Sequence, residues 1–112
     1  MAAKLKIVKL EDVERTEEHG ALASHLISRA QGSEHMDFFH AELPAGYAGE
    51  LVYAGQDEVC YVISGEVELT IDGQAQRVGA GGCFFVAADT QYHYRVTKTP
   101  HEIVAAFSPA SH

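Results

Sequence analysis

The stretch that decides the fold is YAGQDEVCYVISGEVELTIDG, residues 53–73. An acidic residue, Glu58, stands at the start of an apolar run that covers residues 59–63. After Ser64-Gly65, apolar and polar residues alternate strictly over residues 66–71, which is typical of a strand with one buried face. Asp72-Gly73 then predicts a tight hairpin turn, because both turn positions require a positive φ. The stretch therefore predicts two β-strands and a turn that leads into a third.

Short apolar segments bounded by turn residues recur on both sides of this stretch. Residues 11–20 are acidic and are expected to be exposed, while residues 22–30 fit either a helical turn or a strand. No segment predicts a long helix. Roughly eight to ten short strands at close spacing indicate an all-β sandwich or barrel. Besides the strands of the central stretch, strands are expected at residues 4–10, 36–43, 50–53, 74–78, 83–86, 92–96 and 102–107.

Length and composition are those of one globular domain, residues 1–112. The chain is 46% hydrophobic and 21% charged, which argues against disorder. Its formal net charge of -8 argues against nucleic acid or an anionic membrane as a partner. No apolar run approaches the ~20 residues of a membrane span, and no secretory signal is expected. Cys60 and Cys83 do not make a disulfide scaffold, so a reduced cytoplasmic compartment is the expected location.

Two segments carry a family resemblance. Gly65 follows Glu58 by seven positions within EVCYVISGE, and a glycine-rich corner at residues 79–82 precedes His93. Over residues 38–107, these segments resemble the two motifs of the cupin family of small β-barrels. The resemblance implies a single-domain, jelly-roll-like barrel with its core in residues 36–107. Residues 1–35 would then supply an N-terminal strand and a connecting segment.

The chain departs from the cupin pattern in the first motif. That motif normally carries a His-x-His pair before its glutamate. Here Leu51 and Tyr53, or Val52 and Ala54 in the other register, occupy the two positions before Glu58. Two of the four usual metal ligands are therefore missing.

The second motif also departs from the pattern, because Ala88 and Thr90 replace its proline and loop glycine while His93 is kept. A narrower similarity links residues 40–46, 58–66 and 89–95 to ectoine synthase, a cupin that also lacks the histidine pair. That family binds iron through a Glu, a Tyr and a His. The resemblance implies Glu58 and His93 for two of these ligands, whereas Phe85 stands at the tyrosine position.

These observations predict a divalent metal ion (iron, zinc, nickel or manganese) held by Glu58 and His93. His40 shares a strand face with Phe38 and is the candidate for a third ligand. Three nitrogen and oxygen ligands with an open position are typical of catalytic zinc or non-heme iron. The competing interpretation is a solvated rim glutamate, a half-exposed strand histidine and a histidine with a hydrogen-bonded ring.

The site would also contain groups that act on a substrate. Tyr53 and Tyr92 are candidate proton donors or acceptors, and Tyr53 is alternatively a packed aromatic residue. Cys60, Phe85 and Gln56 are candidates for contacting the ligand. The predicted function is a metal-dependent lyase, cyclase or isomerase acting on a small polar metabolite. The alternative is a cupin that has lost its metal and only binds or senses a small molecule.

The run from Val59 to Ile63 is apolar on both faces of its strand. One face can fill the barrel, so the other needs a cover. A second subunit would provide it, which predicts a homodimer. Cover by the N-terminal segment of the same chain is the alternative.

Overall fold

The structure, a computed structural model, describes residues 4–111. Over this range the chain forms eight β-strands and two short 3-10 helices and contains no α-helix. The all-β architecture expected from the sequence is confirmed. The elements are η1 (Leu10–Asp12), β1 (Thr16–Glu18), β2 (Ala21–Ile27), η2 (Arg29–Gln31), β3 (Asp37–Leu43), β4 (Ala48–Leu51), β5 (Asp57–Ile71), β6 (Gln74–Gly79), β7 (Cys83–Val86) and β8 (Tyr92–Ser108).

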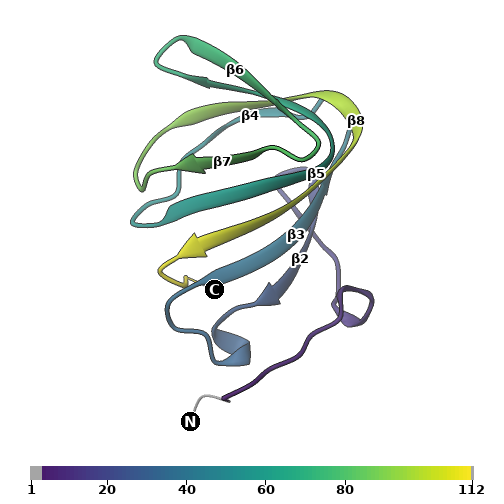
Figure 1. The fold of residues 1–112 in the computed structure, drawn as a ribbon, viewed down its shortest axis with the longest axis vertical. Coiled ribbons are helices and arrows are strands. Elements are labelled where there is room, and N and C mark those ends of the chain that lie inside the picture. The colour runs from purple at the N-terminus through teal and green to yellow at the C-terminus, as the bar shows by residue number, and fades with distance from the viewer. Residues whose placement is uncertain (1–3, 112) are drawn as a thin grey trace.

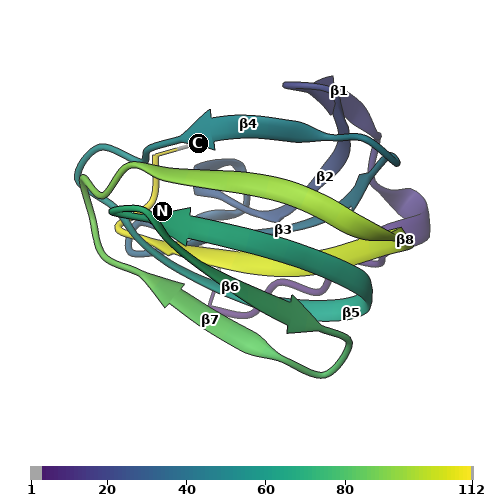
Figure 2. The same cartoon turned by 90° about the horizontal axis from the view of Figure 1, so that it is seen from above.

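Two long, bent strands, β5 and β8, take part in both layers of the barrel (Figure 1). The first half of β5 pairs with β7 and with the second half of β8, and this layer continues through β3 and β2 to β1. The second half of β5 pairs with β6 and with the first half of β8, which also pairs with β4. All pairings are antiparallel. Seen from above, the two layers enclose the interior of a jelly-roll-like barrel (Figure 2).

The corner in β5 lies at Gly65, where the sequence predicted a break between two strands. Gly65 has a φ of 76°. A Cβ atom there would lie 2.4 Å from the carbonyl oxygen of Lys98 and 2.6 Å from that of Pro100. The register with β8 shifts on both sides of this glycine, so β5 turns without ending. In the same way, the two strands predicted over residues 92–96 and 102–107 are a single strand, β8.

The hairpin turn is as predicted. Asp72 and Gly73 have φ values of 51° and 77°, and β6 follows directly. The alternation also holds on β5, where Glu58, Cys60 and Val62 point into the barrel and are buried. Further inward-facing residues complete the core, namely Val67, Val86, Tyr92, Tyr94, Val96, Ile103, Ala105 and Phe107.

The N-terminal part differs from the expectation. Residues 4–9 pair with no strand within the described part of the chain, so the predicted edge strand is not formed. Residues 22–30, which fitted a helix or a strand, belong mainly to β2, and Ser28 caps the short helix η2 through its side chain. No helix within residues 4–111 has the length and apolar character needed to cross a membrane.

Candidate interior site

An interior cavity of about 220 Å³ lies between the two layers. It is smaller than the roughly 300–1,000 Å³ of a typical drug-binding pocket. Glu58 is part of its lining, and phenylalanine and tyrosine side chains form one part of the wall. The cavity can therefore enclose a small molecule next to a carboxyl group. The aromatic wall consists of Phe39, Tyr47, Tyr53, Tyr92, Tyr94 and Phe107.

Glu58 and Tyr92 form a buried hydrogen-bonded pair at this cavity. The two residues are 4% and 1% exposed, and the Tyr92 hydroxyl donates to Glu58 Oε1 at 2.6 Å. Burial raises the pKa of Glu58 to about 7, although the hydrogen bond from Tyr92 acts in the opposite direction. The carboxyl group therefore exchanges its proton near neutral pH. Within residues 4–111, Tyr92 is the only side chain that hydrogen bonds to Glu58, so the second carboxyl oxygen is available to a ligand.

Strand alternation explains why these two side chains meet. Glu58 shares the inner face of β5 with Cys60 and Val62, which are fully buried. Tyr92 shares the inner face of β8 with Tyr94. Since neighbouring residues of a strand point to opposite faces, a tyrosine at 92 that points inward turns residue 93 outward.

The three predicted metal ligands are consequently not brought together. His93 points out of the barrel, and its Nδ1 atom lies 2.9 Å from Glu50 Oε1. His40 lies on the outer face of β3, because Phe39 and Ala41 line the cavity, and its Nε2 atom contacts Glu102. The part of the chain described by the structure contains no group of three or more His, Cys, Asp or Glu side chains arranged to hold a metal ion.

The backbone of the loop before β8 explains why counting from the loop glycine of the second motif led to His93. The sequence interpretation placed Thr90 at the loop-glycine position, three residues before His93. The residue with a left-handed backbone is Asp89, with a φ of 65°, and this conformation suits Gly, Asn or Asp. The same three-residue step from Asp89 leads to Tyr92, which lines the cavity.

Tyr53 and Gln56 both line the cavity, as a role in ligand contact requires. The Tyr53 ring packs against Phe107 with a centroid separation of 4.5 Å. Burial, and secondarily the charge of Glu58, raise the pKa of Tyr53, so its hydroxyl stays protonated. The Gln56 amide nitrogen donates to the carbonyl oxygen of Pro109 at 2.6 Å and to Asp37 Oδ2 at 3.3 Å, which ties it to the C-terminal segment.

Cys60 and Phe85 do not line this cavity. Cys60 is fully buried in the core, where burial raises the pKa of its thiol. Phe85 points outward from β7 and is 60% exposed, because its neighbours Phe84 and Val86 face the interior. Cys60 therefore lines neither cavity, whereas Phe85 lines the open cavity between β6 and β7.

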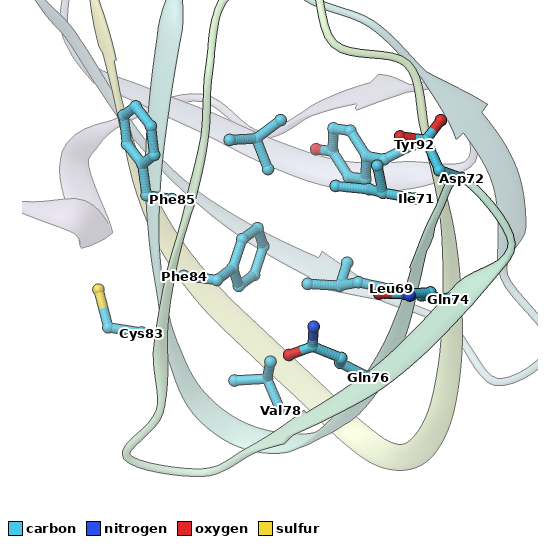
Figure 3. A pocket seen from close by; sticks show the side chains of 11 residues that line it. Leu69, Ile71, Asp72, Gln74, Gln76, Val78, Cys83, Phe84, Phe85 and Tyr92 are labelled. Atoms are coloured by element: carbon cyan, nitrogen blue, oxygen red, sulfur yellow. The ribbon is translucent and has the colours of Figure 1, made fainter.

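A second, open cavity of about 560 Å³ lies between β6 and β7 (Figure 3). Phe84 extends into it toward Leu69, whereas Cys83 points away from it. Gln76 adds an amide group to the lining. Tyr92 lines this cavity as well as the interior one, so its ring forms part of the wall of both.

Several polar residues of the interior cavity were not identified from the sequence. Glu18 and His25 line it, with His25 Nε2 2.6 Å from Glu18 Oε2. In a strand, His25 falls on the same face as Ala21 and Ala23. This signal was hidden because residues 22–30 fitted either a helical turn or a strand. Tyr94 also lines the cavity. Its hydroxyl lies 2.5 Å from Nε2 of the buried His101, whose Nδ1 lies 3.0 Å from the Ser64 carbonyl oxygen.

Comparison with known proteins agrees with this architecture. The sequence profile of the cupin domain matches residues 39–107. A comparison with curated proteins finds no match. Among solved structures, KdgF from Halomonas sp. has 16% identity and a TM-score of 0.81, covering 95% of this chain and 96% of its own.

Two further structures have the same fold. Ectoine synthase from P. lautus has 17% identity and a TM-score of 0.82, with 94% of this chain and 78% of that chain covered. PAC13 from Streptomyces, solved with uridine, has 21% identity and a TM-score of 0.81, with 98% and 86% covered. At these identities the likeness establishes the barrel fold.

Proposed function

Because this chain belongs to the cupin domain family, we propose that its barrel binds a small molecule and that Glu58 exchanges a proton with it. The observation that carries the proposal is the buried pair of Glu58 and Tyr92 at the wall of the interior cavity. A general acid or base is most effective when its pKa lies near the working pH, and burial raises the pKa of Glu58 to about 7.

The chemistry follows from this pair. An ionised Glu58 removes a proton from a carbon atom next to a carbonyl group of the ligand. Returning the proton to another atom of the ligand gives an isomerisation, and delivering it to a departing hydroxyl group gives an elimination of water. Tyr92 holds the carboxylate in place, and the Tyr53 hydroxyl is a second protonated donor on the same wall.

Charge and shape indicate the class of ligand. The chain carries a net charge of -8, and Glu18 adds a carboxyl group to the cavity lining. Both disfavour an anion, while aromatic walls accept a flat or cationic group. We infer a small neutral or positively charged molecule. PAC13, a barrel of the same fold solved with uridine, supports a small polar ligand for this architecture.

The family resemblance also implied a divalent metal ion, and the donors around Glu58 do not fit one. Tyr53 and Tyr92 line the cavity with Glu58, and burial raises the pKa of both hydroxyl groups and keeps them protonated. His93 and His40 face outward with carboxylate partners. We therefore derive no step through a metal ion.

A second candidate function is binding without catalysis. Within residues 4–111 no group of His, Cys, Asp or Glu side chains is arranged to hold a metal ion, which favours it, because a ligand can occupy the cavity without any proton transfer. Substitution of Glu58 separates the two functions. A catalyst loses turnover and keeps its ligand, whereas a binding module has no turnover to lose.

The test begins with a panel of small neutral and cationic metabolites, screened for binding by ligand-observed NMR. Each binder is then incubated with the protein, and the products are followed by NMR. Proton-transfer catalysis contributes about 10²- to 10⁴-fold, so Glu58→Gln should lower the rate by at least about 100-fold and retain binding. Glu50→Gln, which removes an exposed outward carboxylate, is the control and should leave the rate unchanged. An unchanged rate in Glu58→Gln contradicts the proposal.

We also propose that the protein is a homodimer. On the outer face of β5, Val59, Tyr61 and Ile63 are 45%, 46% and 41% exposed. Contiguous exposed apolar side chains are typical of a protein–protein interface. A second copy of the chain is the simplest partner for this face, because it is present in every solution of the protein.

A further inference from the structure

Two hydrogen bonds in series lead from the interior cavity to the corner of β5. The Tyr94 hydroxyl lies 2.5 Å from Nε2 of His101, and Nδ1 of the same ring lies 3.0 Å from the carbonyl oxygen of Ser64. Tyr94 and His101 are 3% and 2% exposed, and Tyr94 lines the cavity. Tyr94 therefore connects this series of bonds to the space that a ligand would occupy. Neither residue takes part in the proton transfer proposed for Glu58.

The bend of β8 brings the two side chains together. Tyr94 lies in the half of β8 that pairs with β4, and His101 lies beyond the bend, in the half that pairs with β3 (Figure 1). The corner of β5 packs against the same place. A Cβ atom added at Gly65 would lie 2.8 Å from the His101 Cα atom, so the glycine allows the neighbouring Ser64 carbonyl group to approach the ring.

The Ser64 carbonyl group sets the direction of both hydrogen bonds. A carbonyl oxygen can only accept, so His101 Nδ1 carries the ring hydrogen and donates it to Ser64. Burial lowers the pKa of His101, although the hydrogen bond to Ser64 acts in the opposite direction. The ring is therefore neutral at pH 7, and its Nε2 atom has a lone pair and no hydrogen. It follows that the Tyr94 hydroxyl donates to Nε2.

This direction leaves Tyr94 with lone pairs only for a ligand. A hydroxyl group has one hydrogen to donate and two lone pairs that accept. Burial raises the pKa of Tyr94, so the hydrogen stays on the hydroxyl group and is used in the bond to His101. Within residues 4–111, His101 is the only residue that hydrogen bonds to this hydroxyl group. The Tyr94 oxygen can therefore accept a hydrogen bond from a ligand but has none to donate.

The charges of the lining select among ligands that donate hydrogen bonds. The lining includes two carboxyl groups, Glu18 and Glu58, and two histidines, His19 and His25, of which His25 is paired with Glu18. No Lys or Arg among the described residues lines the cavity. Aromatic faces add attraction for a cation. A protonated amine suits these surroundings, because it has both N–H donors and a positive charge.

We propose that the interior cavity recognises a small primary amine in its protonated form, with the Tyr94 oxygen accepting a hydrogen bond from the ammonium group. His101 is a positioning residue, because it uses the Tyr94 hydrogen and so disfavours a carboxylate or carbonyl group at this point. The inference rests on the proposed function and narrows its neutral or cationic ligand to an amine. Tyr92 lies two positions before Tyr94 on the same strand face, so the two ends of the ligand would lie roughly 7 Å apart along β8.

The first test compares ligands that share a carbon skeleton and differ in one group. Ligand-observed NMR at pH 7 measures the affinities of ethylamine, isobutylamine and benzylamine and of the matching alcohols and carboxylates, such as benzyl alcohol and benzoate. Hydrogen bonds to charged groups are stronger than those between neutral groups, so the tightest-binding amine should bind at least about 10-fold more tightly than its alcohol and its carboxylate. An alcohol or carboxylate that binds as tightly as that amine overturns the inference, as does failure of all three amines to bind.

The second test asks whether Tyr94 recognises the ammonium group or only packs. Tyr94→Phe removes the accepting oxygen and keeps the ring, so amine affinity should fall at least about 10-fold and the preference for amine over alcohol should narrow. A purely structural role would weaken the binding of both ligands alike. Tyr61→Phe removes a hydroxyl group from the exposed outer face of β5 and is the matched control, which should change neither affinity. An unchanged preference in folded Tyr94→Phe contradicts the inference.

The third test examines the parent protein without a ligand, so it holds even if Tyr94→Phe fails to fold. In protein labelled with ¹⁵N at histidine, NMR should show His101 at pH 7 with a hydrogen on Nδ1 and none on Nε2. His101→Gln assigns the resonances. A hydrogen on Nε2 would leave the Tyr94 hydroxyl free to donate and would overturn the inference. None of the three tests depends on turnover, so they fail separately from the role proposed for Glu58.

Discussion

The Tyr92 hydroxyl and the Glu58 carboxylate are joined by a 2.6 Å hydrogen bond that crosses the barrel from one layer to the other. Tyr92 comes from the half of β8 that pairs with β4, and Glu58 from the half of β5 that pairs with β7. The bond therefore has two consequences. It ties the layers together, and it holds a carboxyl group with a pKa of about 7 beside the cavity.

Substitution of Glu58 should make stability less dependent on pH. The pKa of Glu58 is raised from 4.5 to about 7 in the folded protein, so its favourable contribution is complete below pH 4.5 and is lost as pH rises through 7. At about 1.4 kcal/mol per pKa unit, the change is about 3 kcal/mol. Between pH 4 and pH 8, the free energy of unfolding of Glu58→Gln, measured in urea, should therefore rise by about that much relative to the parent. Glu14→Gln, which removes an exposed carboxylate, is the control, and a difference that stays constant with pH contradicts the raised pKa.

Loss of the Tyr92 hydroxyl should destabilise the protein most at high pH. The hydrogen bond stabilises the ionised form of Glu58, so Tyr92→Phe leaves a buried carboxylate without its donor. A cost of about 1–3 kcal/mol at pH 8 is expected, falling as pH drops and the carboxyl group becomes protonated. Urea unfolding of Tyr92→Phe and the parent at pH 4 and pH 8 measures this cost. Equal losses at pH 4 and pH 8 would show that the hydroxyl does not act on the carboxylate.

The corner of β5 should tolerate no side chain. In Gly65→Ala, the new Cβ atom would meet backbone atoms of Lys98 and Pro100 at 2.4 and 2.6 Å, and a loss of more than about 3 kcal/mol is expected. Gly73→Ala has nearly the same φ and no atom within 4 Å of the added Cβ, so it should cost about 1–2 kcal/mol. Thermal unfolding of both variants checks this. Equal losses would mean that strain alone, without the close backbone contact, sets the cost at Gly65.

Metal content should be far below one ion per chain. The prediction rests on the outward positions of His93 and His40, away from Glu58. Elemental analysis of protein purified without a histidine tag measures it, and His93→Ala should not alter the content. About one ion per chain, lost in Glu58→Ala, would contradict the placement of these side chains.

The sequence predicted the strands well because their signals are local. Asp72-Gly73 placed the hairpin turn, and alternation after Gly65 placed the second half of β5. The corner itself was read as a break, because a bulged glycine and a strand end look alike in a sequence. The contact that reveals a corner, between Gly65 and Lys98, joins residues far apart in the chain.

The site was predicted less completely, since a strand has a period of two. Alternation groups His40 with Phe38 but does not tell which group faces inward. The loop motif led to His93, whereas the structure places the neighbouring Tyr92 in the lining of the cavity. Glu58, a predicted site residue, does line the cavity, and it shares the inner face of β5 with Cys60 because both lie in one uninterrupted strand.

The most direct test of the account is an NMR titration of Glu58 in protein labelled with ¹³C at the glutamate carboxyl groups. Glu58→Gln assigns the resonance. We expect Glu58 to titrate with a pKa of about 7 in the parent and higher in Tyr92→Phe, because the hydroxyl favours the ionised form. A pKa near 4.5 in both proteins would contradict a buried, Tyr92-bonded carboxyl group as the centre of the site.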